Sequence, residues 1–294
     1  MNMDKNQYKT YHENKTHTPT DFPYNTYLCS IPLDFNSVKT HWHDEIEIIV
    51  IKKGIGIVSV DLTAYDVKAG DIIFILPAQL HSIEQKNNDV MEYENILFKS
   101  SLIKTSGQDY CGNNFLQPLL SGKLNLNPVI DHTCNYQAEL SDIIRNIDSL
   151  CDSRPYGYQL AVKGYLFQVM YVLVSNCGEI KRKNVSRKSL EKTKSILTYI
   201  ADNYKKSISI EEISNYCFYS KSYFMKFFKE TMGMGFIQYL NDYRLEIAAK
   251  MLLDTSDNIL DVALNTGFEN LSYFNRCFKR KYGVTPRKYR TQNS

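Results

Sequence analysis

The sequence predicts a multidomain chain: an N-terminal β-barrel followed by a helical pair, then an all-α domain with two helix-turn-helix motifs joined by a long linker helix. Three observations predict this architecture. Short apolar runs separated by Gly and Pro fill the first part of the chain, as in all-β domains. One helical unit occurs twice in the last part, where Ser222-Tyr223-Phe224 returns as Ser272-Tyr273-Phe274. That last part is basic, whereas the remainder is acidic.

The composition limits the class of protein. With 294 residues, 43% hydrophobic and 23% charged, the chain has the size and character of two ordinary globular domains. No stretch reaches the ~20 apolar residues of a membrane span, and the polar N-terminus lacks the apolar core of a signal peptide. The seven cysteines are scattered without a Cys-x-x-Cys pair, which argues against disulfides and zinc knuckles. We therefore expect a cytoplasmic protein with no membrane partner.

The N-terminal part begins with residues 1–26, which are polar without a clear period and are expected to form a flexible arm. Residues 27–130 form the predicted barrel. Its strands are expected where Ile and Val gather, at 45–51, 55–62 and 72–76. Glycines and a proline separate these runs, which favours a barrel or sandwich of short strands.

The helical pair is expected within residues 131–180. Apolar residues recur at three- and four-residue spacing from Leu140 to Leu150 and again from Leu160 to Leu173. Such helices either cover the barrel or pair with a second copy of the chain, and both possibilities remain open. We expect this region to dimerise the protein. The basic run 181–188 is the expected interdomain linker.

The C-terminal domain, 189–294, is expected to be all-α. Residues 187–294 contain 18 Lys and Arg against 11 Asp and Glu, a basic balance typical of nucleic-acid modules. Ser220 is the expected N-cap of the helix that follows it. Periodicity predicts helices at 189–203, 210–217, 221–232, 236–252, 259–265 and 270–282, with a last turn from Pro286.

Each unit of the repeat has a short helix, a turn and a longer helix, which is the outline of a helix-turn-helix DNA reader. The inner face of each longer helix is expected to be core, with Phe224, Phe227 and Phe228 in the first copy and Phe274, Cys277 and Phe278 in the second. Side chains on the opposite face are expected to reach base edges, because Arg binds guanine and Asn binds adenine bidentately. The predicted base contacts are Ser222, Met225, Lys226, Leu271, Ser272, Asn275 and Arg276.

Basic residues at the edges of these faces are expected to bind phosphates, which supplies affinity without sequence information. The predicted phosphate contacts are Lys221, Lys229, Lys279, Arg280 and Arg287.

A set of residues near the C-terminus matches a known pattern: Gly267-Phe268, Ser272-Tyr273-Phe274, Phe278-Lys279, Tyr282-Gly283-Val284-Thr285-Pro286 and Tyr289-Arg290, with Tyr239-Leu240, Arg244-Leu245 and Ala248 in the predicted long helix. Through these residues, about 100 C-terminal residues resemble the AraC/XylS family of bacterial transcription regulators. The resemblance implies promoter DNA, a small-molecule effector such as a sugar, and RNA polymerase as partners, a homodimer, and more often activation than repression. One departure is Phe218, where the family usually has glycine in the turn; it is expected to adjust the first turn or to pack against the linker helix.

A second group of residues, in the barrel, resembles the two sequence motifs of cupins. His41, His43 and Glu47 match the first motif, and His81 closes the second, which lacks its usual asparagine. Sensor domains of AraC-type regulators often resemble cupins, so these residues and Tyr93 are the expected effector pocket, with Glu94 as a weaker candidate. We expect no catalytic residue, no bound metal and no cofactor.

Two alternatives from other classes remain open. Three imidazoles and a carboxylate suit iron, manganese or zinc, so the chain is alternatively a metal-dependent cupin enzyme fused to a DNA-binding domain. The second alternative is a constitutive DNA-binding protein with no effector, whose operator affinity no small molecule alters.

Overall fold

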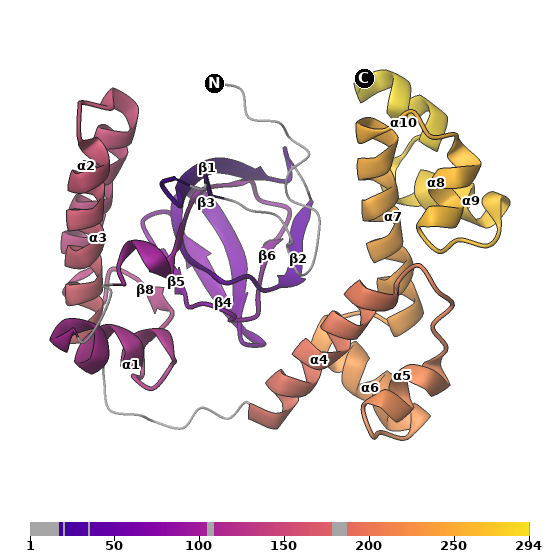
Figure 1. Ribbon diagram of the computed structural model, residues 1–294, viewed down its shortest axis with the longest axis horizontal. Coiled ribbons are helices and arrows are strands. Elements are labelled where there is room, and N and C mark those ends of the chain that lie inside the picture. The colour runs from indigo at the N-terminus through magenta and orange to yellow at the C-terminus, as the bar shows by residue number, and fades with distance from the viewer. Residues whose placement is uncertain (1–17, 20, 35, 105–108, 178–186, 294) are drawn as a thin grey trace. The chain divides into compact units, whose positions relative to one another are not determined.

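The computed structural model describes residues 18–19, 21–34, 36–104, 109–177 and 187–293. They form two compact units, one of strands and helices that ends at Cys177 and one all-helical unit that begins at Arg187 (Figure 1). The predicted arm up to residue 17 and the predicted linker at 181–186 lie outside the described residues. Among the described helices, none is long and apolar enough to cross a membrane.

The N-terminal unit is built on strands, as the sequence predicts, and the pairs among them are antiparallel. One set of strands has the order β1-β7-β3-β5-β8. In a second set, the second half of β3 pairs with β4 on one side and with β6 on the other, and β6 pairs with β2. The strand β3 therefore belongs to both sets. The strands are β1 (Tyr24–Ile31), β2 (Ser37–His41), β3 (Glu45–Val60), β4 (Thr63–Lys68), β5 (Ile72–Ile75), β6 (His81–Gln85), β7 (Met91–Lys99) and β8 (Val129–Ile130).

Two details differ from the sequence predictions. Tyr24 is buried and pairs with Phe98, so the sheet begins three residues inside the segment that composition assigns to the arm. The runs 45–51 and 55–62 are one strand, because Gly54 bends the strand instead of ending it. Its φ is +78°, and a Cβ there would lie 1.9 Å from the carbonyl oxygen of Val90. Only glycine permits both this φ and this close approach.

Successive residues of a strand face opposite sides of a sheet, and here the two sides differ in chemistry. Ile48 and Phe98 belong to the same apolar cluster as the helices α2 and α3. The neighbouring positions turn to the other side, where the buried residues include polar ones such as Glu47, Tyr93 and Asn95. The side that faces away from the helices therefore holds buried polar groups.

The helical pair covers the apolar side of the sheet. Its helices are α2 (Gln137–Ser153) and α3 (Tyr158–Ser175), which bury Ile143 and Leu166 within that cluster. Arg154, in the left-handed region with φ 45°, ends α2. A stretch that the sequence did not predict, with η1 (Ser100–Leu102), η2 (Gly112–Leu116) and α1 (Gln117–Leu120), packs Leu102, Leu116 and Leu119 into the same cluster. The apolar faces of α2 and α3 therefore pack against the sheet of their own chain.

The C-terminal unit contains all the predicted helices. The two helix-turn-helix motifs, α5–α6 and α8–α9, lie at opposite ends of the long helix α7 (Figure 1). The helices are α4 (Arg187–Asn203), α5 (Ile210–Tyr216), α6 (Lys221–Met232), α7 (Phe236–Asp254), α8 (Ile259–Asn265), α9 (Leu271–Tyr282) and α10 (Pro286–Asn293).

Side-chain caps fix where the four short helices begin. Ser209 and Asn258 accept hydrogen bonds from the backbone N–H groups of residues 212 and 261 at the starts of α5 and α8. Ser220, as predicted, accepts from Tyr223 N, and Asn270 accepts from Tyr273 N in the second motif. Each cap is worth about 1 kcal/mol, so both motifs begin their recognition helix in the same way.

Aromatic rings form the core of each motif. In the first, Phe228 contacts Phe236 and Tyr239 of α7 edge to face, at centroid distances of 5.5 and 5.2 Å. In the second, Phe274 and Phe278 lie in one apolar cluster with residues of α7 and α8. The linker helix is therefore part of both cores, which ties the two motifs together.

Candidate functional site

The turn between the two helices of each motif contains a residue with positive φ. Gly267 has φ +85°, and Phe218 has φ 58° at the corresponding place in the first motif. The ring of Phe218 is 90% exposed, and the amino group of Lys192 lies 5.5 Å from its centroid. Phe218 therefore keeps the geometry of the turn at the cost of strain. The expectation that it packs against the linker helix is wrong, because the side chain is exposed to solvent.

The first recognition helix, α6, presents its predicted contact residues to solvent. Ser222, Met225 and Lys226 are exposed, as are Lys221 and Lys229. On the inner side Phe224 and Phe228 are fully buried. Phe227, expected in the core, is only half-buried and lies beside the rings of Tyr219 and Tyr223.

Two of the α6 lysines form exposed ion pairs. Lys221 Nζ lies 2.9 Å from a carboxylate oxygen of Glu211, and Lys226 Nζ lies 3.9 Å from one of Glu230. Exposed pairs of this kind contribute about 0–1 kcal/mol. Breaking either ion pair therefore costs little free energy, so each lysine can bind a phosphate or a base instead of the carboxylate.

The predicted contact residues of the second recognition helix, α9, differ in how exposed they are. Ser272, Arg276, Lys279 and Arg280 are exposed, and so is Arg287 of α10. Asn275 and Leu271 are half-buried. Leu271 packs against the core of the motif, so only part of its side chain is available to a thymine methyl group.

Tyr273, to which the sequence analysis gave no role at the DNA-contacting face, lies beside Arg276. The guanidinium carbon of Arg276 lies 5.3 Å from the ring centroid of Tyr273, one helical turn earlier. The hydroxyl of Tyr273 in turn accepts a hydrogen bond of 2.9 Å from Asn241 Nδ2 on α7. The linker helix thus orients the ring on which the arginine rests. The signal in the sequence is the three-residue spacing of Tyr273 and Arg276.

Lys281 is basic but does not face outward. Its amino group donates to the carbonyl oxygen of Asp242 at 2.8 Å and lies 2.7 Å from Glu246 Oε1, both on α7. This side chain attaches the end of α9 to the linker helix, so it is a structural lysine within a basic helix.

The second site, in the N-terminal unit, brings together the predicted histidines. His41 ends β2, His81 begins β6, and the two are register partners, with ring centroids 4.1 Å apart. His43 lies between β2 and β3, with its ring 5.0 Å from that of His81. The ligand atoms of the three imidazoles all lie within 4.8 Å of one another. We call these residues, with Glu47, the histidine cluster.

Glu47 connects two of the histidines. Its Oε2 lies 3.0 Å from Nε2 of His43, with which it forms a hydrogen bond, and 2.8 Å from Nε2 of His81. Glu47, His43 and His81 are all buried, whereas His41 is partly accessible. A buried carboxylate therefore lies against imidazole nitrogens, at the side of the sheet that faces away from the helices.

The electrostatics of the cluster follow from this packing. Burial lowers the pKa of His41 well below its usual value, and the charges of His81 and His43 add to the effect. Burial alone would raise the pKa of Glu47, but the neighbouring His81 and His43 outweigh it and hold that pKa well below its usual value. Glu47 is thus a carboxylate at neutral pH.

Tyr93 and Glu94 are neighbours in β7 with opposite placements. Burial raises the pKa of the Tyr93 hydroxyl well above its usual value, and Cys29 and the charge of Glu47 add to this, so Tyr93 lies near the cluster. Glu94 faces the helices, where its carboxylate lies 2.6 Å from Lys52 Nζ. The expectation that Glu94 lines the same site is wrong, because adjacent strand residues alternate between the two faces.

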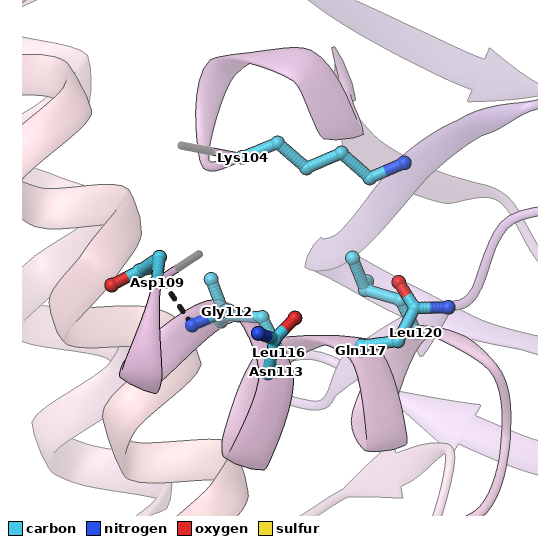
Figure 2. Close-up of a pocket in the computed structure, with 7 residues that line it drawn as sticks. All are labelled: Lys104, Asp109, Gly112, Asn113, Leu116, Gln117 and Leu120. Atoms are coloured by element: carbon cyan, nitrogen blue, oxygen red, sulfur yellow. Dashed lines mark hydrogen bonds between the residues drawn. The ribbon is translucent and has the colours of Figure 1, made fainter. Parts of the chain in front are cut away.

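A hollow of about 150 Å³ lies elsewhere in this unit. Lys104 and Asp109 border it, together with one face of the helical segment η2–α1, and Asp109 accepts a hydrogen bond of 2.8 Å from Gly112 N (Figure 2). None of the predicted effector residues lines this hollow.

Comparison with known families gives one match in each unit of the chain. Residues 33–167 match the model of an AraC-like ligand binding domain, and residues 213–292 match the model of a helix-turn-helix domain. The two matches include the histidine cluster and both recognition helices.

Among curated proteins, the chain is 26% identical over 281 residues to YdeC of Bacillus subtilis (strain 168), an uncharacterized HTH-type transcriptional regulator, covering 95% of each chain. It is 28% identical over 187 residues to the regulatory protein PocR of Salmonella typhimurium, covering 60% of this chain and 62% of that protein. A third relative, SACOL0084 of Staphylococcus aureus, is 30% identical over 132 residues, covering 45% of this chain and 18% of that one.

Solved structures match either the C-terminal part or most of the chain. A protein of unknown function from Listeria innocua is 32% identical with a TM-score of 0.34, covering 35% of this chain and 97% of that one. ToxT from Vibrio cholerae is 15% identical with a TM-score of 0.45, covering 92% of this chain and 100% of that one.

The two domain models, the relative that matches over nearly its whole length and the paired recognition helices lead to one assignment. The chain belongs to the AraC family of helix-turn-helix regulators, in which a ligand-binding domain precedes a sequence-specific DNA-binding domain that controls transcription.

Proposed function

We propose that this protein is an effector-responsive activator that reads two neighbouring stretches of major groove with α6 and α9. The observation that carries the proposal is the exposure of basic and polar side chains on both recognition helices, which α7 holds at its two ends. The α7 helix has 19 residues and is about 28 Å long at 1.5 Å per residue. That is shorter than the ~34 Å between successive major grooves on one face, so modest DNA bending accompanies binding.

The proposed roles divide by position on the helix, because residues near its N-terminus reach bases and later ones meet phosphates. We assign base contacts to Ser222, Met225, Lys226, Leu271, Ser272, Asn275 and Arg276, with Arg276 the strongest. We assign phosphate contacts to Lys221, Lys229, Lys279, Arg280 and Arg287.

Binding of the full chain to its own upstream promoter region, compared with random duplex over a salt series, tests this function. We expect binding to the promoter that is tighter by about 10³-fold or more, and affinity for both DNAs that falls steeply with salt. Equal affinity for promoter and random duplex at every salt concentration would exclude sequence-specific reading.

The effector is proposed to bind on the polar side of the sheet, beside His41, His43, Glu47, His81 and Tyr93. Support comes from buried side-chain atoms that make no hydrogen bond among the described residues: the Tyr93 hydroxyl and the side-chain amide oxygen Oδ1 of Asn95. Buried groups of this kind need partners, and the hydroxyls of a sugar or similar polar molecule supply them. Tyr93→Phe removes one such partner and is expected to weaken the response to the effector.

The response itself is measured as a change in promoter affinity when the small-molecule fraction of host cells is added. We expect a change of about 5–150-fold, and a smaller change in Tyr93→Phe. Promoter affinity that stays the same in both proteins would favour the constitutive alternative, in which the N-terminal domain senses nothing.

The helical region 131–180 is proposed to form a homodimer through the outer face of α3. Leu160, Gly164 and Tyr171 recur there at helical spacing and are exposed, although α3 is apolar. An exposed apolar stripe of this kind is typical of a subunit interface. Leu160→Glu is expected to convert a dimer into a monomer in sedimentation experiments. The same sedimentation mass for wild type and variant would exclude this face.

The remaining assignments rest on the family. RNA polymerase is the proposed partner in activation, the cytoplasm is the proposed location, because promoter DNA is there, and no catalytic activity is proposed. The proposed domain limits are 27–130 for the sensor, extended back to Tyr24, and 189–294 for the DNA reader, with 181–188 as the linker.

A further inference from the structure

We infer that Arg244 holds the two recognition helices in a fixed orientation, and so sets the spacing of the two DNA sites that the protein reads together. Arg244 lies near the middle of α7, between the two helix-turn-helix motifs (Figure 1). It is a positioning residue and not a DNA contact, because only 8% of it is exposed. The inference deepens the proposed function and rests on it, since spacing matters only if α6 and α9 read one duplex.

The linker helix by itself fixes the distance between the motifs but not their tilt. Near its start, Phe236 and Tyr239 contact Phe228 of the first motif. Near its end, Leu252 lies in one apolar cluster with residues of α8 and α9. Apolar contacts are not directional, so a motif that packs on one stretch of a helix can rock about it. A fixed orientation needs a second contact that is directional.

Arg244 makes such a contact with the chain that enters the first motif. Its Nε donates a hydrogen bond of 2.8 Å to the carbonyl oxygen of Tyr204, and its Nη2 donates one of 2.6 Å to that of Lys206. Both carbonyls lie in the segment that connects α4 to α5. The guanidinium is planar and rigid, so two hydrogen bonds from one guanidinium fix a direction as well as a distance.

The helix α4 belongs to the first motif, because it packs along α5. The rings of Tyr199 on α4 and Tyr216 on α5 have centroids 4.5 Å apart. Ser195 Oγ donates a hydrogen bond of 3.1 Å to the hydroxyl of Tyr216, and the Tyr199 hydroxyl donates one to the carboxylate of Glu212. A contact that holds the end of α4 therefore also holds the first motif.

The turn of the second motif packs on the same arginine. A Cβ on Gly267 would lie 2.9 Å from Arg244 Nε and 2.4 Å from the carbonyl oxygen of Tyr204. The ring of Phe268, part of the apolar core of this motif, has its centroid 5.9 Å from the guanidinium carbon. Burial lowers the pKa of Arg244, and the charge of Glu269 in the same turn opposes this. Both motifs thus meet at one guanidinium.

Arg244 therefore joins three segments: the linker helix, the chain that enters the first motif and the turn of the second motif. With these joined, α6 and α9 keep one distance and one rotation relative to each other. The DNA must then match the protein, either in the spacing of its two sites or by bending. Without the contacts of Arg244, each motif rocks on α7 and adapts to other spacings.

The chain contains a matched arginine that makes the same kind of contact within the second motif. Arg290 of α10 donates from Nε to the carbonyl oxygen of Leu252 at 2.9 Å, and from Nη2 to that of Asp257 at 2.6 Å. These carbonyls lie in the last turn of α7 and just before α8. Loss of these hydrogen bonds loosens the second motif but leaves the connection between the motifs, so Arg290→Met is the control for Arg244→Met.

The first experiment measures the orientation without DNA, in the full chain. Spin labels are placed at the exposed positions 229 of α6 and 279 of α9. They are introduced as a non-natural amino acid, because the chain has seven cysteines. Pulsed electron paramagnetic resonance then gives the distribution of distances between the labels. We expect a narrow distribution in wild type and in Arg290→Met, and a broader one in Arg244→Met, which keeps a long side chain but donates no hydrogen bond.

The second experiment measures binding to the operator, mapped by footprinting on the upstream promoter region, and to operators with one base pair added or removed between the two sites. One base pair turns the sites relative to each other by roughly 35°. We expect wild type and Arg290→Met to prefer the native spacing by about 10²-fold, because a rigid pair of readers otherwise engages only one site. In Arg244→Met this preference is expected to fall to about tenfold or less. A merely structural role would lower both affinities and leave their ratio unchanged.

Three results overturn the inference. The first is a broad distribution of distances in wild type. The second is a distribution in Arg244→Met as narrow as that of wild type. If Arg244→Met does not fold, Arg244→Lys takes its place, because it keeps the charge but not the planar fork. The third is a spacing preference that Arg290→Met reduces as much as Arg244→Met does.

Failure of the proposed function gives a different result. A wild-type chain that binds promoter and random duplex equally contradicts sequence-specific reading. The distance measurement uses no DNA, so it still decides whether Arg244 holds the two recognition helices in one orientation.

Discussion

Gly267 lies directly against Arg244. A Cβ built on Gly267 would lie 2.9 Å from Nε of Arg244 and 2.4 Å from the carbonyl oxygen of Tyr204. The same Arg244 Nε donates a 2.8 Å hydrogen bond to that oxygen, and its Nη2 donates to Lys206 O at 2.6 Å. Arg244 thus links α7 to the chain that follows α4, and the turn of the second motif packs directly against this arginine.

Gly267→Ala is expected to destabilise the C-terminal unit by about 3 kcal/mol. A positive φ costs a non-glycine residue about 1–2 kcal/mol, and the Cβ also displaces Arg244 from its charged hydrogen bonds, which are worth about 1.5–3 kcal/mol. Urea unfolding measures the change. The matched control is Phe218→Gly, at the corresponding position of the first turn.

Phe218→Gly is expected to change the free energy of unfolding by less than about 1 kcal/mol, since relief of the strain and the added freedom of the unfolded chain nearly cancel. If Gly267→Ala has the same free energy of unfolding as wild type, Arg244 can move away from the new Cβ without destabilising the unit.

Arg276→Ala is expected to weaken binding to the promoter by about 1–3 kcal/mol and to relax the preference at one base pair. The reason is that a guanidinium reads guanine through two hydrogen bonds. Binding to a set of single-base variants of the operator measures this. An equal loss on random DNA would show that Arg276 contacts phosphate only.

Lys279→Ala is the comparison for that experiment. It is expected to weaken binding to all sequences similarly and to reduce the slope of log affinity against log salt by about 1. A selective loss on the promoter would instead place Lys279 at a base edge.

Tyr273→Phe tests whether Tyr273 positions Arg276. The variant keeps the ring but removes the hydroxyl that accepts from Asn241, a loss of about 0.5–1.5 kcal/mol in stability. We expect promoter affinity to fall less than in Arg276→Ala, with random-duplex affinity unchanged. The two substitutions are expected to be non-additive, because they act on one contact. If the two effects on promoter affinity are fully additive in a double-mutant cycle, Tyr273 does not act through Arg276.

Asp148 is expected to make stability depend on pH. Burial and the charge of Glu94 raise its pKa to about 6, although Lys52 opposes this. A carboxyl whose pKa is raised on folding stabilises the protein at acid pH, and this contribution is lost as pH rises from about 4 through about 6. Asp148→Asn is therefore expected to stabilise the protein at pH 7 by about 1–2 kcal/mol and to have little effect at pH 4.

Chemical unfolding of wild type and variant at both pH values measures this difference. Asp142→Asn is the matched control, because Asp142 lies on the same helix but is exposed, and it is expected to show no such dependence. A destabilised Asp148→Asn at pH 7 would mean that the ion pair with Lys52 outweighs the burial.

The helices of the C-terminal unit could be predicted closely because local signals define them. The caps Ser220 and Asn270 and the glycines Gly233 and Gly283 each act within one helical turn, at a helix end. The bend of β3 at Gly54 could not be predicted, since the same glycine ends a strand in one context and bends it in another. What decides is the approach of Val90, which is distant in the sequence.

The sequence by itself determined the family, the order of the two domains and the types of residue at both sites, because motifs and periodicity depend on neighbours along the chain. Only the tertiary structure decided which of these residues act together. It placed Tyr273 under Arg276, turned Lys281 inward and separated Tyr93 from Glu94. It also brought His41, His43 and His81 together around Glu47. Such relations depend on distances between segments remote in the chain, and those distances arise only when the strands and helices pack.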